Sequence, residues 1–452
     1  MSATDSVRGL STAAATGRAH PSRRLRRIVV GSLLTGLIAA GVLTLGVFGG
    51  APEHAITGSA LLGFALGWAM LAVLSIRMTD QPQRWALVPA AAMAVTGAGL
   101  LVVAPGDSGL TAAGWVWPPL LLALAVWMGL QVRRSLPARS GRWALYPVVT
   151  VMVAAALGGM VETVAVAADS RTDAMPGQSY DVGGYRLHLD CTGSGSPTVV
   201  LQSGQGEASP HWSRIAQAVS GTTRVCAYDR AGQGWSDAPQ AQDGLRAAAD
   251  LHTLLSRAGE QGPYVLVGHS IGGAHAMTYA SAYPEEVAGM VLLDSTDPYG
   301  APPVDRSGEA GASASFAALP VLARLGLGWV ASSLAPSALP EPAAGQVDAL
   351  AATPRHWRNY GDDFATMPAL LGQAQALTTL GSVPLVVLTA DASLDRPAAH
   401  DRMAEMSSNS SHRFTDETHA GVLEEPRGAD VSVRAIEDVV RSARSGSPLP
   451  QR

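Results

Sequence analysis

The distribution of apolar residues divides the chain into two unlike parts. In the first part, five long apolar runs follow one another with short polar separators, at roughly 28–50, 57–78, 85–104, 112–132 and 143–168. Each run approaches the about 20 apolar residues that a helix needs to cross a bilayer. A run such as Gly31–Phe48 is apolar on every side, whereas a helix of a soluble domain keeps a polar face. The pattern predicts a transmembrane domain of about five helices over 28–168 rather than a signal peptide, which has one short apolar segment.

The second part alternates short apolar runs with stretches of helical periodicity, after a linker at 169–179. The runs lie at Thr198–Leu201, Arg224–Tyr228, Tyr264–Val267, Met290–Leu293, Leu385–Thr389 and, more weakly, His412–Thr415, and the helical stretches lie at His211–Val219, Leu245–Ala258, Ile271–Tyr283 and Val431–Ala443. Continuous apolar runs are typical of strands buried on both faces, and their alternation with helices predicts a mostly parallel sheet. We therefore expect an α/β domain over 180–445 and a C-terminal tail at 446–452. An interruption at about 298–382 is too long for a simple loop and predicts a lid over the strand ends.

Charge separates the same two parts. The chain has 452 residues, of which 47% are hydrophobic and 15% are charged, and these averages describe neither part. Up to Ala168 the basic residues exceed the acidic ones by seven, whereas from Asp169 onward the acidic residues exceed the basic ones by twelve. Arginines occur in the N-terminal tail at 1–27 and at the second and fourth separators, while the first and third separators contain none. By the positive-inside rule, this predicts a cytoplasmic N-terminus and an extracytoplasmic C-terminal domain. Nothing in the charge distribution indicates binding to nucleic acid.

A nucleophile motif lies between a predicted strand and a predicted helix. Residues Gly268–Gly272 read Gly-His-Ser-Ile-Gly, which matches Gly-x-Ser-x-Gly, and the strand Tyr264–Val267 leads directly into it. A sharp turn at this place needs glycines beside the serine and exposes the hydroxyl at the N-terminus of the next helix. The sequence therefore predicts that Ser270 is a catalytic nucleophile.

A serine nucleophile needs a base, and the base needs a carboxylate that orients it. His419 follows the last predicted strand and is the predicted base; His412 is the nearest rival, and His269 is expected to be a structural neighbour of Ser270. Three aspartates are open as the acid, in the order of preference Asp395, Asp391 and Asp294. An acyl transfer also needs two backbone N–H donors for the oxyanion. The N–H of Ile271 and the N–H of Gln205, in the Gly-rich turn after Thr198–Leu201, are the predicted donors.

The elbow, the Gly-rich turn, the order Ser-Asp-His and the stretch Asp229–Ser236 (DRAGQGWS) together resemble the α/β-hydrolase superfamily over roughly 180–442. The resemblance implies a mostly parallel eight-stranded sheet with helices on both faces and a helical lid. It is closest to a serine-hydrolase branch fused to N-terminal transmembrane helices. Two departures are Ser203-Gly204, where that family usually has His-Gly, and the lack of a clean Gly-x-x-Asp after the seventh strand, which leaves the acid open. A serine at the elbow, in place of aspartate, argues against the epoxide-hydrolase and haloalkane-dehalogenase mechanisms.

The strand order of that superfamily brings the two cysteines, Cys191 and Cys226, onto neighbouring strands. A disulfide in an oxidising compartment and a pair of buried thiols are both open. No Cys/His spacing is typical of a metal site, and no cofactor is expected.

These features predict a membrane-anchored serine hydrolase, similar to esterases and lipases, that cleaves an ester or related acyl substrate on the extracytoplasmic side. Its expected partners are a small-molecule or lipid-like acyl substrate and the membrane. A non-catalytic membrane sensor or scaffold and an acyltransferase with the same triad are the alternatives. The substrate and the oligomeric state are left open.

Overall fold

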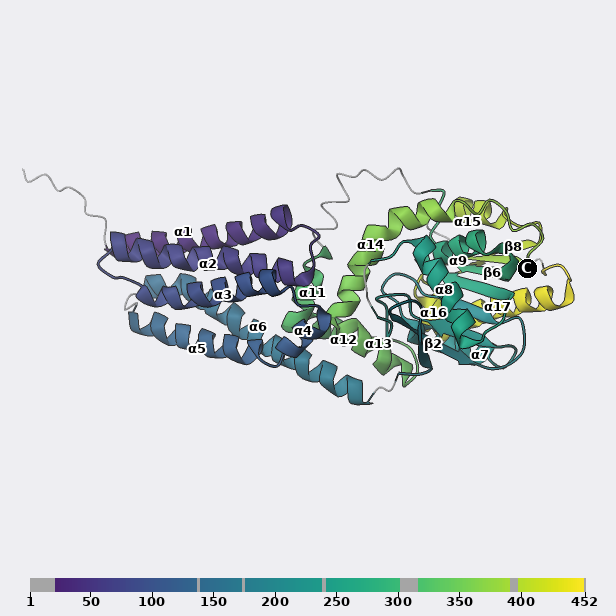
Figure 1. The fold of residues 1–452 in the computed structure, drawn as a ribbon, viewed down its shortest axis with the longest axis horizontal. Coiled ribbons are helices and arrows are strands. Elements are labelled where there is room, and N and C mark those ends of the chain that lie inside the picture. The colour runs from purple at the N-terminus through teal and green to yellow at the C-terminus, as the bar shows by residue number, and fades with distance from the viewer. Residues whose placement is uncertain are drawn as a thin grey trace, which may run out of the picture.

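The computed structural model describes residues 21–135, 139–172, 175–237, 241–300, 316–390 and 397–450. The described helices of the N-terminal part run side by side as a bundle, and a sheet flanked by helices forms the other end of the molecule (Figure 1). The helices of the bundle are α1 Pro21–Gly41 with its continuation η1 Val42–Val47, α2 Glu53–Met78, η2 Arg84–Ala86, α3 Leu87–Val103, α4 Asp107–Ala113, α5 Trp117–Ser135 and α6 Arg139–Thr172. Four helices are long and apolar enough to cross a membrane, or five if the bent pair α4–α5 is one span.

The bend in the α4–α5 pair has a local cause. The two helices meet at an angle of 46°, within the fourth of the predicted apolar runs. Pro118 and Pro119 lie in the first turn of α5. Because proline has no N–H to donate to the preceding turn, α4 cannot run on into α5 as one regular helix. The sequence analysis expected about five apolar helices, and the structure confirms four to five.

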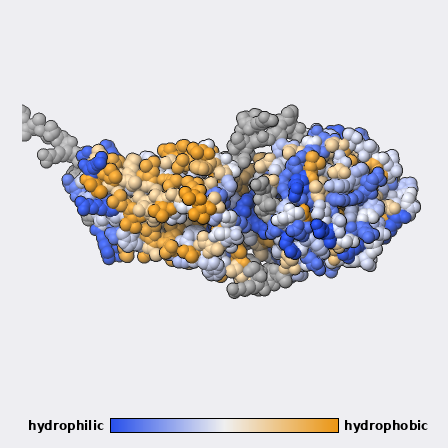
Figure 2. All heavy atoms as spheres, in the orientation of Figure 1, coloured by the Kyte–Doolittle hydropathy of each residue, from blue (hydrophilic) through white to orange (hydrophobic). Residues whose placement is uncertain are grey.

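The outer surface of the bundle is apolar. Val95 and Val102 on α3 are 73% and 84% exposed, and hydrophobic residues cover much of the bundle in Figure 2, while the end of the molecule that contains the sheet is mainly hydrophilic. Between α1 and α2 the backbones approach so closely that a Cβ at Gly63 would overlap with the backbone of Ala40. Close packing through small residues is typical of helices that associate in a bilayer.

The C-terminal part contains an eight-stranded sheet in the order β1-β2-β4-β3-β5-β6-β7-β8. The strands are β1 Gln178–Asp181, β2 Arg186–Thr192, β3 Val199–Gln202, β4 Val225–Tyr228, β5 Tyr264–His269, β6 Val287–Leu293, β7 Leu385–Ala390 and β8 Ser410–Thr415. The β1–β2 and β2–β4 pairs are antiparallel, and every other pair is parallel. The predicted mostly parallel sheet of eight strands is therefore confirmed.

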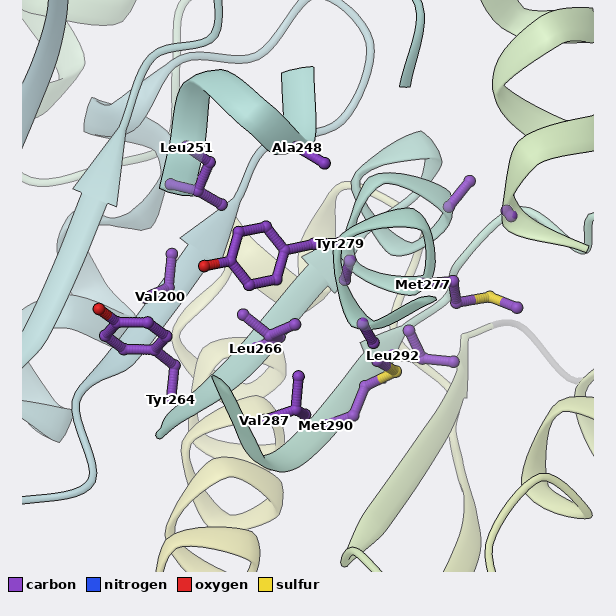
Figure 3. Close-up of a cluster of buried hydrophobic side chains, with 14 of the residues drawn as sticks. Val200, Ala248, Leu251, Tyr264, Leu266, Met277, Tyr279, Val287, Met290 and Leu292 are labelled. Carbon is purple, nitrogen blue, oxygen red and sulfur yellow. The ribbon is translucent and has the colours of Figure 1, made fainter. Parts of the chain in front are cut away.

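Helices cover both faces of the sheet. Successive strand side chains point to opposite faces, and on each face they form a separate hydrophobic core with the covering helices. The helices are η3 Ser209–Trp212, α7 Ser213–Val219, α8 Gly244–Ala258, α9 Ile271–Ala282, η4 Pro284–Glu286, α15 Pro397–Ala404, α16 Gly421–Glu424 and α17 Pro426–Ser445. On one face, Leu266 and Met290 pack against Tyr279 of α9 (Figure 3). On the other face, Val265 and Val267 belong to a second core with residues of α7 and α17. The sheet is thus buried on both sides, as its continuous apolar runs predicted.

Cys191 on β2 lies directly opposite Cys226 on β4, and a disulfide joins the two residues. Their neighbouring positions follow from the antiparallel pairing of these two strands.

The segment between β6 and β7 contains α11 Leu319–Leu322, η5 Ala323–Leu327, α12 Gly328–Leu334, α13 Ala343–Ala352 and α14 Pro354–Ala374. These helices, called the lid below, lie between the bundle and the sheet (Figure 1). Helix α14 begins at Pro354 because Thr353 caps its N-terminus by accepting a hydrogen bond from the His356 N–H, and Pro354 occupies the first turn.

Candidate active site

Ser270 stands at a sharp turn between β5 and α9. Its backbone is held at φ 54° and ψ −127°, a region that side chains rarely adopt. A Cβ at Gly268 would overlap with Gly272 and Gly273, and a Cβ at Gly272 would overlap with the carbonyl of Gln202, so the turn requires glycine at both places. The Ser270 N–H donates to the Leu293 carbonyl over 3.2 Å, and its own carbonyl accepts from the Thr296 N–H over 3.0 Å. The segment after β6 thus fixes the backbone of Ser270.

A histidine and an aspartate meet beside this turn. His419, between β8 and α16, has its Nδ1 2.5 Å from Oδ2 of Asp294, which follows β6 directly. The Asp294 side chain is 1% exposed, and its Oδ1 accepts a hydrogen bond from the Ala390 N–H. When the proton of His419 is on Nδ1, its Nε2 is an acceptor. The His419 side chain is 42% exposed. Its Nδ1 is held by Asp294, and the remainder of the ring is accessible.

Of the three aspartates considered as the acid, Asp294 is the one in contact with His419 in the described part of the chain. Asp395 and Asp391, which the sequence analysis preferred, lie outside the described residues. Asp294 reaches the histidine because β6 ends beside β5, and because its backbone turns sharply at φ 39°. Aspartate tolerates this left-handed conformation better than most residues. The rival base His412 is held elsewhere, with Nδ1 2.7 Å from Asp401 and Nε2 2.7 Å from the Thr389 hydroxyl.

The Gly-rich turn after β3 lies against Ser270. A Cβ at Gly204 would be 3.0 Å from the Cβ of Ser270. The carbonyl of Gly204 accepts from Arg230 Nη2 over 3.4 Å and from Gln233 Nε2 over 3.3 Å. In a planar trans peptide the C=O and the following N–H point in opposite directions. The N–H of Gln205 therefore points away from Arg230 and Gln233.

The second predicted donor is the N–H of Ile271. Ile271 is the first residue of α9, so its N–H has no acceptor inside the helix. The side chain of Gln205 is engaged separately, because its amide Nε2 donates to the Tyr360 carbonyl of α14 over 3.0 Å. One predicted oxyanion residue is thus tied to the lid.

The Asp229–Ser236 stretch forms hydrogen bonds with the Gly-rich turn after β3. Arg230 Nη1 donates to the Ser203 carbonyl over 2.6 Å. Asp229 is fully buried; burial would raise its pKa, but the hydrogen bond and charge of His188 outweigh burial and lower it. The Asp229 carboxylate also accepts from the Ser209 and Trp235 N–H groups. This loop shapes the site without carrying a nucleophile or base.

Glu207 is a site residue that the sequence analysis did not single out. Its Oε2 accepts a hydrogen bond from the Gly204 N–H over 2.5 Å, and its Oε1 lies 2.6 Å from Nδ1 of His269. Nε2 of His269 lies 2.9 Å from the carbonyl oxygen of His419. The Glu207–His269 pair therefore connects the Gly-rich turn to the loop that carries His419. The only signal in the sequence was a carboxylate three residues after Gly204.

Burial and the partner side chain have opposite effects on the pKa of Glu207 and on that of His269. Burial would raise the pKa of Glu207, but the charge of His269 and its hydrogen bond outweigh burial and lower this pKa to about 2. Burial would lower the pKa of His269, but the charge of Glu207 outweighs it and raises this pKa. Removing one partner of such a pair leaves the other as an unpaired buried group.

We expect Glu207→Gln to lower kcat for ester hydrolysis about tenfold through misplacement of the Gly-rich turn and the His419 loop. The matched control is Glu260→Gln, because Glu260 is also a buried carboxylate in an ion pair, with the partly exposed Arg224, away from Ser270. The lowered pKa of Glu207 contributes to stability fully above the unfolded pKa of 4.5, and this contribution is lost as the pH falls towards 2. The raised pKa of His269 contributes fully below the unfolded pKa of 6.5, and this contribution is lost as the pH rises through the raised pKa. The variant should therefore differ most from the parent in thermal unfolding between pH 4.5 and 6.5. Equal effects of the two substitutions on kcat would contradict a positioning role.

Known proteins resemble the C-terminal part. A family profile described as the alpha/beta hydrolase fold matches residues 197–316. The chain is 40% identical over 111 residues to Lipase LipV of Mycobacterium tuberculosis, covering 24% of this chain and 41% of that protein. It is 31% identical over 121 residues to the uncharacterized protein YbdG of Bacillus subtilis, covering 26% of this chain and 37% of that protein. The chain thus spans less than half the length of these relatives.

Solved structures also align with this part. A thermophilic esterase from Thermogutta terrifontis aligns at 23% identity and a TM-score of 0.43, covering 58% of this chain and 95% of the other. An enol-lactonase from Burkholderia xenovorans aligns at 19% identity and a TM-score of 0.44, covering 58% and 100%. The sheet order, the serine at the elbow after β5 and the family match agree: the C-terminal part of the chain has the α/β-hydrolase fold, and apolar helices that could span a membrane precede it.

Proposed function

We propose that the protein is a membrane-anchored serine hydrolase that cleaves an ester or a related acyl substrate. The contact between His419 and Asp294, beside a serine at the elbow between β5 and α9, carries this proposal. A buried carboxylate at Nδ1 leaves Nε2 of the histidine as the base that a serine hydroxyl needs. The relative LipV is named as a lipase, which supports an ester substrate.

The reaction follows from these groups. Ser270 Oγ attacks the acyl carbon while its proton moves to Nε2 of His419. The N–H groups of Gln205 and Ile271 donate to the oxyanion, and Asp294 stabilises the imidazolium. His419 returns the proton to the departing alcohol, and a water molecule, deprotonated by His419, then releases the acid and restores Ser270.

The test of this proposal uses the full chain in phospholipid nanodiscs. We expect turnover of p-nitrophenyl esters from acetate to palmitate and no opening of styrene oxide, because the elbow carries serine and not aspartate. A folded protein that turns over none of the esters, or that opens only the epoxide, would refute it.

We further propose that the C-terminal part faces the extracytoplasmic side. The arginines between the apolar helices support this orientation by the positive-inside rule. The Cys191–Cys226 disulfide also supports it, because disulfides persist in oxidising compartments. A reporter fused after Arg452 that works only outside the cytoplasm should be active, and activity of a cytoplasm-only reporter at the same position would refute the orientation.

A further inference from the structure

A large cavity lies where the bundle, the lid and the sheet meet. Its volume is about 590 Å³, and its walls come from the ends of α2 and α4, from α14 and from the loop after β4. Glu53 and Asp107 line it on the side of the bundle, and Arg230 and His275 line it on the side of the sheet. The apolar helices therefore form part of the cavity wall together with the α/β domain.

The side chain of Arg230 lies between this cavity and the candidate active site. Arg230 lines it and donates to the carbonyls of Ser203 and Gly204, in the turn that lies against Ser270. His275 lies five residues after Ser270 on α9, about 7.5 Å along the helix axis at 1.5 Å per residue. A ligand in the cavity would thus contact Arg230, whose guanidinium group lies between the cavity and the turn beside Ser270.

Four charged side chains hold the lid on the bundle at this place. Arg324 of η5 contacts Glu53 of α2, and Arg358 of α14 lies 3.2 Å from Glu53 and 3.0 Å from Asp107. The Glu53 side chain is 3% exposed, so these are substantially buried ion pairs. Removing a single partner of such a group is destabilising, which fixes the position of the lid.

The outer face of the lid is apolar beside the bundle. The backbone of η5 packs against Gly158 of α6, where a Cβ would overlap with the Leu325 carbonyl. Nearby lid residues Leu327 and Leu334 are exposed, the latter by 81%, and so is Leu157 of α6. The exposed apolar surface of the bundle therefore continues onto the lid. A bilayer around the bundle would reach this part of the lid, and the ends of α2 and α4 that line the cavity belong to the same bundle.

The charges in the cavity indicate what it can hold. Among the described residues, its walls carry the carboxyl groups of Glu53, Asp107, Asp362 and Asp363 and the two guanidinium groups of Arg230 and Arg358. Both guanidinium groups lie near carboxylates, Arg358 beside Glu53 and Asp107 and Arg230 at 3.6 Å from Asp363. An anionic phosphate would meet an excess of negative charge here.

A buried imidazole points to an uncharged, hydrogen-bonding ligand. His275 is 7% exposed, and its Nδ1 has no hydrogen-bond partner among the described residues. Burial, with the nearby charge of Arg230, holds its pKa well below the usual range, so the ring is neutral. A neutral imidazole binds a hydroxyl group well, and carboxylates accept from hydroxyl groups.

We propose that this cavity binds the uncharged polyol head of a fatty acyl ester whose chain remains in the bilayer. The proposal rests on the proposed serine-hydrolase function and adds the substrate class and the role of the membrane helices in binding it. The proposal requires the ester bond, which joins the chain to the head, to reach Ser270 on the far side of Arg230.

The test compares substrates that reach Ser270 by different routes, with the full chain in dimyristoyl-phosphatidylcholine nanodiscs. The obstructing variants are Ala365→Trp on α14 and Ala241→Trp on the opposite wall, both at exposed alanines that line the cavity. The matched control is Ala218→Trp, at an exposed alanine of α7 outside the cavity. The probes are monooleoylglycerol in the bilayer, oleoyl-lysophosphatidylglycerol, which adds a phosphate to the same parts, and p-nitrophenyl acetate in water.

We expect the parent to prefer monooleoylglycerol to the lysophospholipid. Each obstructing variant should lower kcat/KM for monooleoylglycerol about tenfold or more and leave p-nitrophenyl acetate within about twofold, while Ala218→Trp changes neither. Unchanged monooleoylglycerol turnover in a folded obstructing variant, equal loss on both esters in both variants, or preference for the lysophospholipid would overturn the inference. A parent that cleaves p-nitrophenyl acetate but not monooleoylglycerol refutes this inference alone, whereas a parent that cleaves neither refutes the proposed function.

Discussion

Replacement of Ser270 by alanine is expected to lower kcat for p-nitrophenyl butyrate by at least about 10⁴-fold. Alanine removes the hydroxyl that forms the acyl-enzyme in the proposed mechanism but keeps a Cβ in the same strained turn, so the variant should fold like the parent. The N–H groups of Gln205 and Ile271 remain and can support only a small residual rate through direct attack by water.

The control for this substitution is Ser445→Ala. Ser445 is an exposed serine at the end of α17, and its hydroxyl donates to the Arg441 carbonyl and accepts from the nearby Ser447 N–H. Hydrolysis is measured by release of p-nitrophenolate in nanodiscs, with thermal unfolding as the check of folding. Retention of more than about a tenth of the parent kcat by a folded Ser270→Ala variant would exclude this serine as the nucleophile.

Replacement of Asp294 by asparagine is expected to lower kcat about 10⁴-fold with little change in KM. Asparagine has nearly the same shape, and its oxygen can still accept from the Ala390 N–H. It carries no charge to stabilise the imidazolium of His419, and its amide can present an N–H to Nδ1, which favours the wrong tautomer.

Asp395→Asn and Asp391→Asn are the informative companions to this variant. Both aspartates follow β7 and were preferred from the sequence, whereas Asp294 contacts His419. We expect kcat of both companion variants to stay within about threefold of the parent. A large loss in Asp395→Asn with a near-normal Asp294→Asn would assign the acid to the end of β7.

The sequence predicts the parts of the site that depend on local structure. Ser270 follows a buried strand and precedes a helix, and glycines stand where a Cβ would overlap with the chain, so the turn is specified by adjacent residues. The apolar helices are predicted for the same reason, because each carries its own signal of length and hydropathy.

Contacts between distant segments are much harder to predict. Asp294 and His419 are 125 residues apart, and their meeting depends on the register of β6 beside β5 and on a backbone turn of positive φ. Arg358 and Glu53 are 305 residues apart, and no local sequence pattern indicates that they meet. Glu207 likewise gains its role only when β5 brings His269 beside it. Such pairs require the fold before they can be identified.

The most direct measurement is the site of covalent modification by a fluorophosphonate, mapped by mass spectrometry of peptides from the full chain in nanodiscs. A serine activated by His419 reacts with this reagent, whereas ordinary serines do not. The proposed function predicts one adduct, on Ser270, formed in parallel with the loss of ester hydrolysis and absent from Ser270→Ala. An adduct on another residue that accompanies the loss of activity, or ester hydrolysis that continues after Ser270 is fully modified, would contradict it.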